Sequence, residues 1–133
     1  YAIHVLGPQL VFEILKPKMQ VRGANVVFLG SLCGIKNVNL PSSLATSHTA
    51  LWGLTQSLSK AHGKDQIKVN LLALGLLESG LSQNLDPKLK KAYLEHSALK
   101  RLGKPQEVAQ WSTWLVTHNT YITGQTINLD GGL

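Results

Sequence analysis

Short apolar runs alternate with longer helical stretches along this chain. Three runs, at 25–29, 67–73 and 125–129, have the length and the β-branched or leucine-rich composition of strands buried on both faces of a sheet. Helical spacing of apolar residues is seen at 1–20 and 44–61, and two further helices are predicted to begin at Asp86-Pro87 and at Pro105. Strands that alternate with helices predict a parallel sheet covered on both faces.

Local signals predict where these helices begin and end. Pro8 and Pro17 interrupt the first helix, Ser42 or Ser43 caps the second, and Gly63 ends it. A sheet of about three strands is small, and its inner edge presents unpaired N–H and C=O groups. We therefore expect that edge to pair with more chain or with a partner.

Composition limits the classes of function. The chain has 133 residues, 44% of them apolar, and this predicts one domain. Its single cysteine, Cys33, forms no internal disulfide, and no thiol or histidine spacing predicts a metal site. No run of about 18 apolar residues predicts a membrane span. We expect a cytoplasmic protein.

The net charge of +6 raises the question of an anionic partner. Apart from Lys88, Lys90 and Lys91, the basic residues are scattered, and no basic stripe carries interleaved aromatic side chains. No nucleic-acid binding is predicted. Scattered positive charge still attracts phosphorylated carriers such as coenzyme A or acyl carrier protein, so that use of the charge stays open.

Three segments resemble the short-chain dehydrogenase/reductase family, and most of all its 3-oxoacyl-carrier-protein reductase branch. Val26–Ser31 is similar to the strand that ends in the family's catalytic serine, and Ile67–Gly75 to its "RVNAIAPG" strand. The family's C-terminal signature is resembled by Arg101–Ala109, Tyr121–Gln125 and Asp130–Gly132. The resemblance implies the C-terminal half of a Rossmann-type doubly wound sheet. Residues 1–133 are then a single incomplete domain that lacks the N-terminal dinucleotide-binding half and its glycine-rich turn.

The resemblance also aligns the catalytic positions. The family uses a tyrosine as proton donor, a lysine four residues later, a serine and an asparagine. Ser31 matches the serine, although a loop-capping role explains it as well. Leu44 stands in place of the tyrosine, His48 in place of the lysine and His4 in place of the asparagine. Leu44 has no ionisable atom, so it is not a general acid.

The cofactor-side loop departs from the family as well. Leu74-Gly75 replaces a Pro-Gly pair, and Ser79 stands where a threonine holds the nicotinamide carboxamide in the family. Gly75 and Ser79 are therefore degenerate cofactor-binding positions. We expect this chain to bind no cofactor, and an active partner to bind NAD(P).

Two functions remain open from the sequence. The first is a pseudoenzyme subunit, similar to the inactive chain of 2-[hydroxy(phenyl)methyl]succinyl-coenzyme A dehydrogenase, in a heterotetramer built through helices 1–20 and 42–62 with an active enzyme for 3-oxoacyl or 3-hydroxyacyl thioesters. The second is an NAD(P)-dependent oxidoreductase that is active only as a longer chain. It would use another acid, such as His4, His48 or one of the phenols Tyr1, Tyr93 and Tyr121. We expect neither Tyr93 nor Tyr121 to lie at a strand end beside Ser31. A degraded gene product without function is a third reading.

Overall fold

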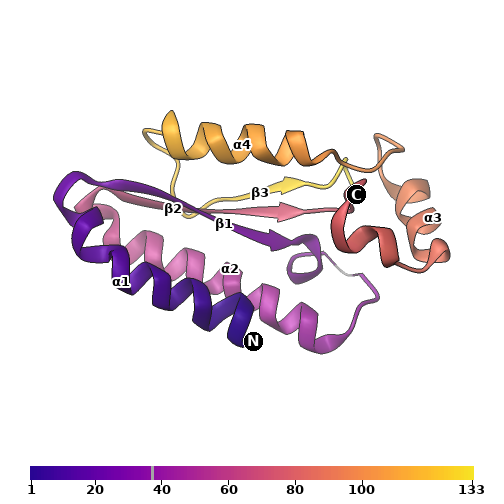
Figure 1. Ribbon diagram of the computed structural model, residues 1–133, viewed down its shortest axis with the longest axis horizontal. Helices are drawn as coiled ribbons and strands as arrows, with labels where there is room; N and C mark the ends of the chain where they lie inside the picture. The colour runs from indigo at the N-terminus through magenta and orange to yellow at the C-terminus, as the bar shows by residue number, and fades with distance from the viewer. Residues whose placement is uncertain (37) are drawn as a thin grey trace.

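A three-stranded parallel sheet forms the centre of the computed structural model, which describes residues 1–36 and 38–133 (Figure 1). Its strands, in spatial order, are β1 (Ala24–Ser31), β2 (Ile67–Leu74) and β3 (Thr126–Leu129). In the register, Ser31 lies opposite Leu74, and Leu74 lies opposite Leu129. The carboxyl ends of all three strands therefore meet at one end of the sheet. The predicted α/β class and parallel pairing are confirmed.

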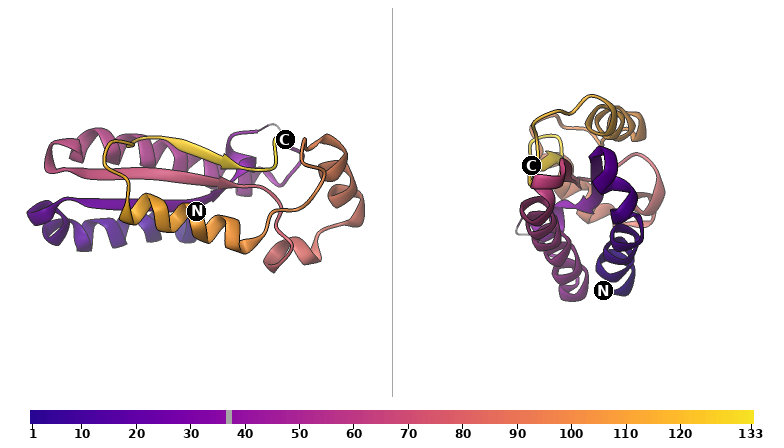
Figure 2. Two further views of the ribbon diagram at one scale, coloured as in Figure 1. Left: turned by 90° about the horizontal axis from the view of Figure 1, so that it is seen from above. Right: turned by 90° about the vertical axis from the view of Figure 1, so that its left-hand side faces the viewer.

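Helices cover both faces of this sheet. Figure 2 shows α1 (Gly7–Arg22) and α2 (Ser42–His62) side by side on one face and α4 (Pro105–Thr117) on the other. The remaining helix, α3 (Pro87–His96), lies beyond the carboxyl ends of the strands (Figure 1). Four short turns complete the elements: a π-helical turn at Ala2–Leu6 and 3₁₀ turns at Leu32–Gly34, Gly63–Asp65 and Gly80–Asn84.

The core lies mainly between the sheet and the α1–α2 layer. Phe12 of α1 and Leu58 of α2 pack with Ile67 and Val69 of β2. Strand β2 is buried along nearly all of its length, as expected for the middle strand of a covered parallel sheet. On the opposite face, Leu115 of α4 is fully buried. These layers hold the strand ends in fixed relative positions.

One of the two predicted signals at the ends of α2 was wrong. Pro41, rather than Ser42 or Ser43, is the N-cap of α2, and no side chain caps this end. Gly63 keeps a right-handed conformation and the chain continues into a 3₁₀ turn, so that Gln66, at φ 58°, is the left-handed residue that ends it. Gly63 is the C-cap of α2, so the predicted helix end is confirmed, and the extra turn only moves the left-handed residue three positions further along the chain.

The first helix also differs from its prediction. Pro8 falls in the first turn of α1, where the missing N–H costs little, but Pro17 lies inside the helix. The helix continues through Pro17, and the residue itself is exposed. Exposure explains the tolerance, because water can solvate the carbonyl that loses its helical hydrogen bond.

Strand β1 is an open edge of the sheet. Among the described residues it pairs with β2 and with no strand on its other side. Leu29 on this strand is 53% exposed. The prediction that three strands leave an unsatisfied edge is confirmed. Across the described part of the chain, no helix is long and apolar enough to cross a membrane.

Candidate functional site

Ser31 is the last residue of β1 and lies at the carboxyl end of the sheet. Its Oγ accepts a hydrogen bond from the backbone N–H of Cys33 at 3.3 Å, which caps the 3₁₀ turn that follows. This hydrogen bond confirms the loop-capping role of Ser31. Because the hydroxyl accepts in that bond, its own hydrogen remains able to donate to a ligand.

Leu44 and His48 lie one turn apart on α2, as their spacing predicts. Leu44 is partly buried in the first turn of the helix, and it is not among the residues that line the pocket at Ser31. His48 is 8% exposed. Its backbone packs against Gly34, and its Nδ1 faces Gly30, so this side chain is held under the end of β1.

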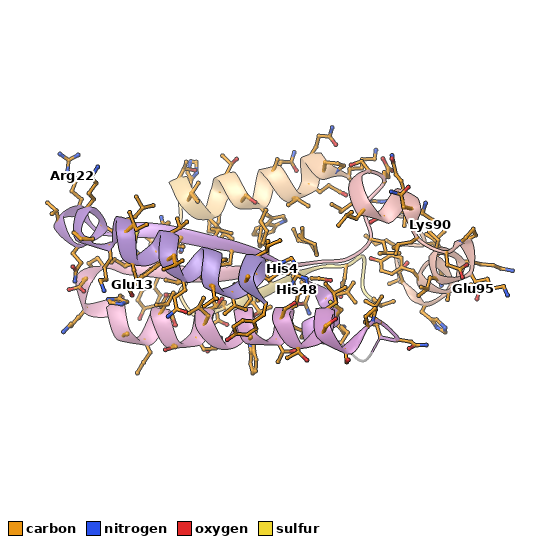
Figure 3. The ribbon with its side chains drawn as sticks, turned by 60° about the horizontal axis from the view of Figure 1, so that its bottom comes forward. His4, Glu13, Arg22, His48, Lys90 and Glu95 are labelled. Carbon is orange, nitrogen blue, oxygen red and sulfur yellow. The ribbon has the colours of Figure 1, made fainter. Side chains whose placement is uncertain are left out.

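His4 and His48 contact each other. Their ring centroids are 4.6 Å apart with a tilt of 43°, and Figure 3 shows the two side chains meeting between the N-terminal turn and α2. These two residues are 44 positions apart in the sequence, and only the family resemblance assigned both of them to one site. The structure places them in contact. Burial lowers the pKa of His48 from its ordinary value of 6.5, and the charge of His4 lowers it further. Nδ1 of His48 has no hydrogen-bond partner among the described residues.

The lowered pKa of His48 predicts that acid destabilises the fold. Between pH 6.5 and the lower folded-state pKa, the unfolded chain binds more protons than the folded chain. The free energy of unfolding should therefore fall as pH drops through this window, and chemical denaturation at a series of pH values measures it. His48→Gln should remove this part of the pH dependence. His4→Gln should only reduce it, because burial is the larger cause; an unchanged pH profile in His48→Gln would contradict the assignment.

A pocket of about 280 Å³ opens beside Ser31 at the strand ends. Most of its wall is apolar and comes from segments that are far apart in the sequence. The lining residues are Ser31, Leu32, Val38, Asn39, Leu40, Leu74, Gly75, Leu76, Leu85, Leu89, Ala92, Tyr93, His96 and Leu133. The pocket is therefore built from the end of β1, the loop before α2, the end of β2, α3 and the last residue described.

The position of Tyr93 differs from the prediction. We expected it on a helix away from the strand ends, but it is buried on α3, and its hydroxyl donates to Asp130 O, just after β3, at 2.6 Å. It shares the pocket with Ser31 because α3 folds back across the carboxyl ends of the strands. Leu85, Leu89 and Tyr93 follow each other at four-residue spacing, and this was the sequence signal that the prediction overlooked.

The electrostatics of Tyr93 do not suit it as a replacement acid. Burial raises its pKa above 10.0, and the nearby charge of Asp130 raises it further. In the family that this chain resembles, a lysine instead lowers the pKa of the phenol. The other two phenols are exposed, and Tyr121, 95% exposed, precedes residues 122–125, which bind the beginning of β2. Tyr121 is therefore at the end of the sheet opposite Ser31.

Of the two predicted cofactor positions, Gly75 serves the fold in this structure. Gly75 ends β2 and donates its N–H to Leu129 O at 2.9 Å, and a side chain there would collide with the Tyr93 hydroxyl. Ser79 is exposed before a 3₁₀ turn, and its side chain caps nothing. The strand ends in the described residues offer no glycine-rich turn that begins a long helix, which a dinucleotide pyrophosphate requires. These residues alone do not fit a complete NAD(P) site.

No group of three or more metal-binding side chains occurs in residues 1–36 and 38–133. Cys33 is a buried, free thiol next to Ser31.

Residues of the C-terminal signature make hydrogen bonds that hold neighbouring segments of the fold together. Arg101 binds Glu107 through two hydrogen bonds, at 2.9 and 2.6 Å, while Glu107 also accepts from the N-cap N–H of Lys104 at 2.8 Å. The hydrogen bonds from Arg101, and with them the one from Lys104 N–H, lower the pKa of Glu107 to about 2. In the second part, Thr123 Oγ1 accepts from Val69 N–H at 3.1 Å. These contacts fix the beginning of α4 and the loop before β3.

Comparison with known proteins finds related reductases. Residues 1–133 match the sequence model of a family described as enoyl-(acyl carrier protein) reductase. The chain is 32% identical over 133 residues to a 3-oxoacyl-[acyl-carrier-protein] reductase of Thermotoga maritima, covering 98% of this chain and 54% of that protein. It is 34% identical over 130 residues to carbonyl reductase family member 4 of Danio rerio, with 98% and 53% covered.

Solved structures show the same arrangement. A 3-oxoacyl-[acyl-carrier protein] reductase from Brucella melitensis superposes with a TM-score of 0.90 at 28% identity, covering 98% of this chain and 50% of that one. A structure of such a reductase with bound NAD, also from Brucella melitensis, superposes with a TM-score of 0.86 at 28% identity, with 98% and 48% covered. This chain spans about half the length of the curated relatives that it matches.

Proposed function

Because the chain belongs to the short-chain dehydrogenase/reductase family, we propose that it is a non-catalytic member that assembles with and stabilises an active enzyme of that family. The active partner binds NAD(P) and acts on a 3-oxoacyl or 3-hydroxyacyl thioester, whereas this chain binds no cofactor. The observation that carries the proposal is Leu44, a hydrocarbon side chain at the position of the proton donor.

The neighbouring groups support this proposal. A proton donor must reach the substrate oxygen and release its proton near neutral pH. His48 is buried under β1 in contact with His4, and Tyr93 is bonded to a backbone carbonyl with a raised pKa. Neither side chain meets both requirements. Ser31 alone matches a family catalytic residue.

The surface of α1 supports the assembly. Of its apolar side chains, only Phe12 is buried, whereas Leu10, Val11 and Ile14 are more than half exposed. Trp52 on the neighbouring helix α2 is also exposed. Large exposed apolar patches mark protein interfaces. A two-fold interface built from these helices accepts a diverged copy and still closes a heterotetramer.

The alternative is an NAD(P)-dependent oxidoreductase that is active as a longer chain. Two observations favour it: Ser31 lines a pocket at the strand ends, and this chain spans about half the length of its relatives. In that case a segment outside residues 1–133 supplies the dinucleotide site and another acid.

Co-purification from the native cell separates the two functions. The proposal expects recovery with an intact relative that retains the tyrosine and lysine, and no turnover of NADH or NADPH with an acetoacetyl thioester by this chain alone. Ile14→Glu should abolish co-purification, because it places a charge in the exposed apolar surface of α1. Tyr121→Glu, an exposed position elsewhere, is the matched control and should have no effect. Recovery as an active homo-oligomer would instead establish the alternative.

A further inference from the structure

The histidine pair joins the beginning of α1 to α2. His4 lies on the π-helical turn Ala2–Leu6, which leads directly into α1, and His48 lies on α2. The two rings are in contact, and Val5 is the buried residue of the same turn. The contact between the rings therefore helps to hold this N-terminal turn against α2.

The surroundings of the pair offer a protonated imidazole no counter-ion. On the segments packed against the pair, the nearest titratable or charged groups in the described residues are Tyr1, Glu13, Cys33, Lys36, Lys60 and Lys68. Only Glu13 is a carboxylate. It lies more than two helical turns beyond His4 and pairs with Lys16. The thiol of Cys33 is neutral in acid, as thiols ordinarily are.

Lys36 follows the turn that packs against His48, but it adds positive charge and is engaged elsewhere. Its ammonium is bound by Leu133 O and lies 3.7 Å from the Asp130 carboxylate. A positive charge on either ring is therefore not compensated in the closed structure.

Protonation acts against the contact. Two imidazolium rings whose centroids lie 4.6 Å apart repel each other, and burial removes the water that would hydrate the charge on His48. Both costs disappear once the turn leaves α2 and the rings reach water. The open turn therefore binds protons better than the closed turn, so that proton binding favours opening.

Opening also affects the surface that the proposed function uses. Leu6 and Leu10, both exposed, lie at the N-terminal end of the apolar surface of α1 and lose their fixed position when the turn leaves α2. We propose that the His4–His48 contact is a pH-sensitive latch, which opens in mild acid, releases the N-terminal turn from α2 and weakens assembly through α1. The effect on assembly rests on the proposed function, whereas the opening is a property of this chain alone.

Amide hydrogen exchange of the full chain tests the opening without a partner. The probes are the hydrogen-bonded amides of Val5 and Gly7 in the N-terminal turn. After correction for intrinsic exchange rates, their protection should fall about tenfold between about pH 7.5 and 5.5, as expected for one additional proton bound in the open state. Low concentrations of urea should change it little, because local opening exposes little surface. The amide of Leu71, bonded within the sheet, should instead follow global unfolding.

Substitutions identify the groups that bind the proton. His48→Gln should abolish the pH dependence at Val5 and Gly7. His4→Gln should reduce it to about threefold, because His48 stays buried, and it decides the question if His48→Gln does not fold. His118→Gln, at an exposed histidine after α4, is the matched control and should keep the full effect. The latch is overturned if protection at Val5 and Gly7 does not depend on pH, or if His48→Gln and His118→Gln behave alike.

The complex with an active partner tests the second half of the proposal. Its Kd should rise by up to about tenfold between about pH 7.5 and 5.5 in the parent chain and stay constant in His48→Gln. A turn that opens while the Kd stays constant would overturn the effect on assembly. Recovery of no complex at any pH would count against the proposed function, whereas the exchange measurement decides the latch by itself.

Discussion

Gly34→Ala is expected to destabilise the fold by about 3 kcal/mol, which is the upper end of the range for overpacking a close contact. A Cβ atom on Gly34 would lie 2.6 Å from the carbonyl carbon of His48 and 2.7 Å from the backbone nitrogen of Thr49. Both atoms belong to the backbone of α2, so no side-chain rotation relieves the collision. The turn after Ser31 would have to move away from α2, with loss of the hydrogen bond from Thr49 Oγ1 to Gly34 O.

Gly53→Ala, on the helix α2 against which Gly34 packs, is the matched control. Nothing lies within 4 Å of a Cβ atom at Gly53. Alanine should therefore stabilise the helix by about 0.5–1 kcal/mol, because it loses less conformational entropy than glycine. Urea denaturation of the three proteins in the same oligomeric state measures both effects. Equal stability of Gly34→Ala and the parent chain would show that the turn and α2 are not in close contact.

Asn70→Ala is expected to cost about 2 kcal/mol for a different reason. Asn70 is 1% exposed in the middle of β2, where its Nδ2 donates to Ile122 O at 2.9 Å and its Oδ1 accepts from Gln125 N–H at 3.0 Å. Alanine would leave the Gln125 N–H without its partner, which costs about 1–3 kcal/mol, and would remove one of two donors from Ile122 O, to which Asn119 Nδ2 also donates at 2.7 Å. The connection between α4 and β3 would lose its anchor on the sheet.

Asn128→Ala on β3 controls for the loss of an asparagine from a strand. Asn128 is exposed, so its replacement should change the free energy of unfolding by no more than about 0.5 kcal/mol. Hydrogen exchange gives a second measurement: the amide of Gln125 should lose protection in Asn70→Ala and keep it in Asn128→Ala. Full protection of Gln125 in Asn70→Ala would contradict the anchoring role.

The sequence predicted the fold well because its signals are local and repeated. Each strand is a short apolar run such as 67–73, and each helix has apolar residues at helical spacing, so pattern and structure agree. Helix ends were predicted less well. Pro41 is the N-cap of α2 in place of the predicted serines, and although Gly63 ends this helix as predicted, the added 3₁₀ turn places the left-handed conformation at Gln66. Turns of this kind depend on packing that a sequence pattern does not contain.

The site was only partly predictable. The resemblance identified Ser31, His4 and His48, and the spacing on α2 fixed the relation between Leu44 and His48. The position of Tyr93 was wrong, because the return of α3 over the strand ends depends on contacts between distant segments. Asp130, which follows β3, supplies the carbonyl that holds Tyr93 there. The pocket as a whole exists only after five segments of the chain have come together.

The link made by Lys36 has a consequence for how molecules reach the pocket. Its ammonium joins the loop after Ser31 to Leu133 and lies near the buried carboxylate of Asp130, so opening the structure there would leave that carboxylate without its counter-ion. Helix α3 forms the opposite wall, and Tyr93 is its buried side chain. Opening the pocket on the Lys36 side would therefore break this ion pair, and opening it by outward movement of α3 would break the hydrogen bond from Tyr93 to Asp130 O.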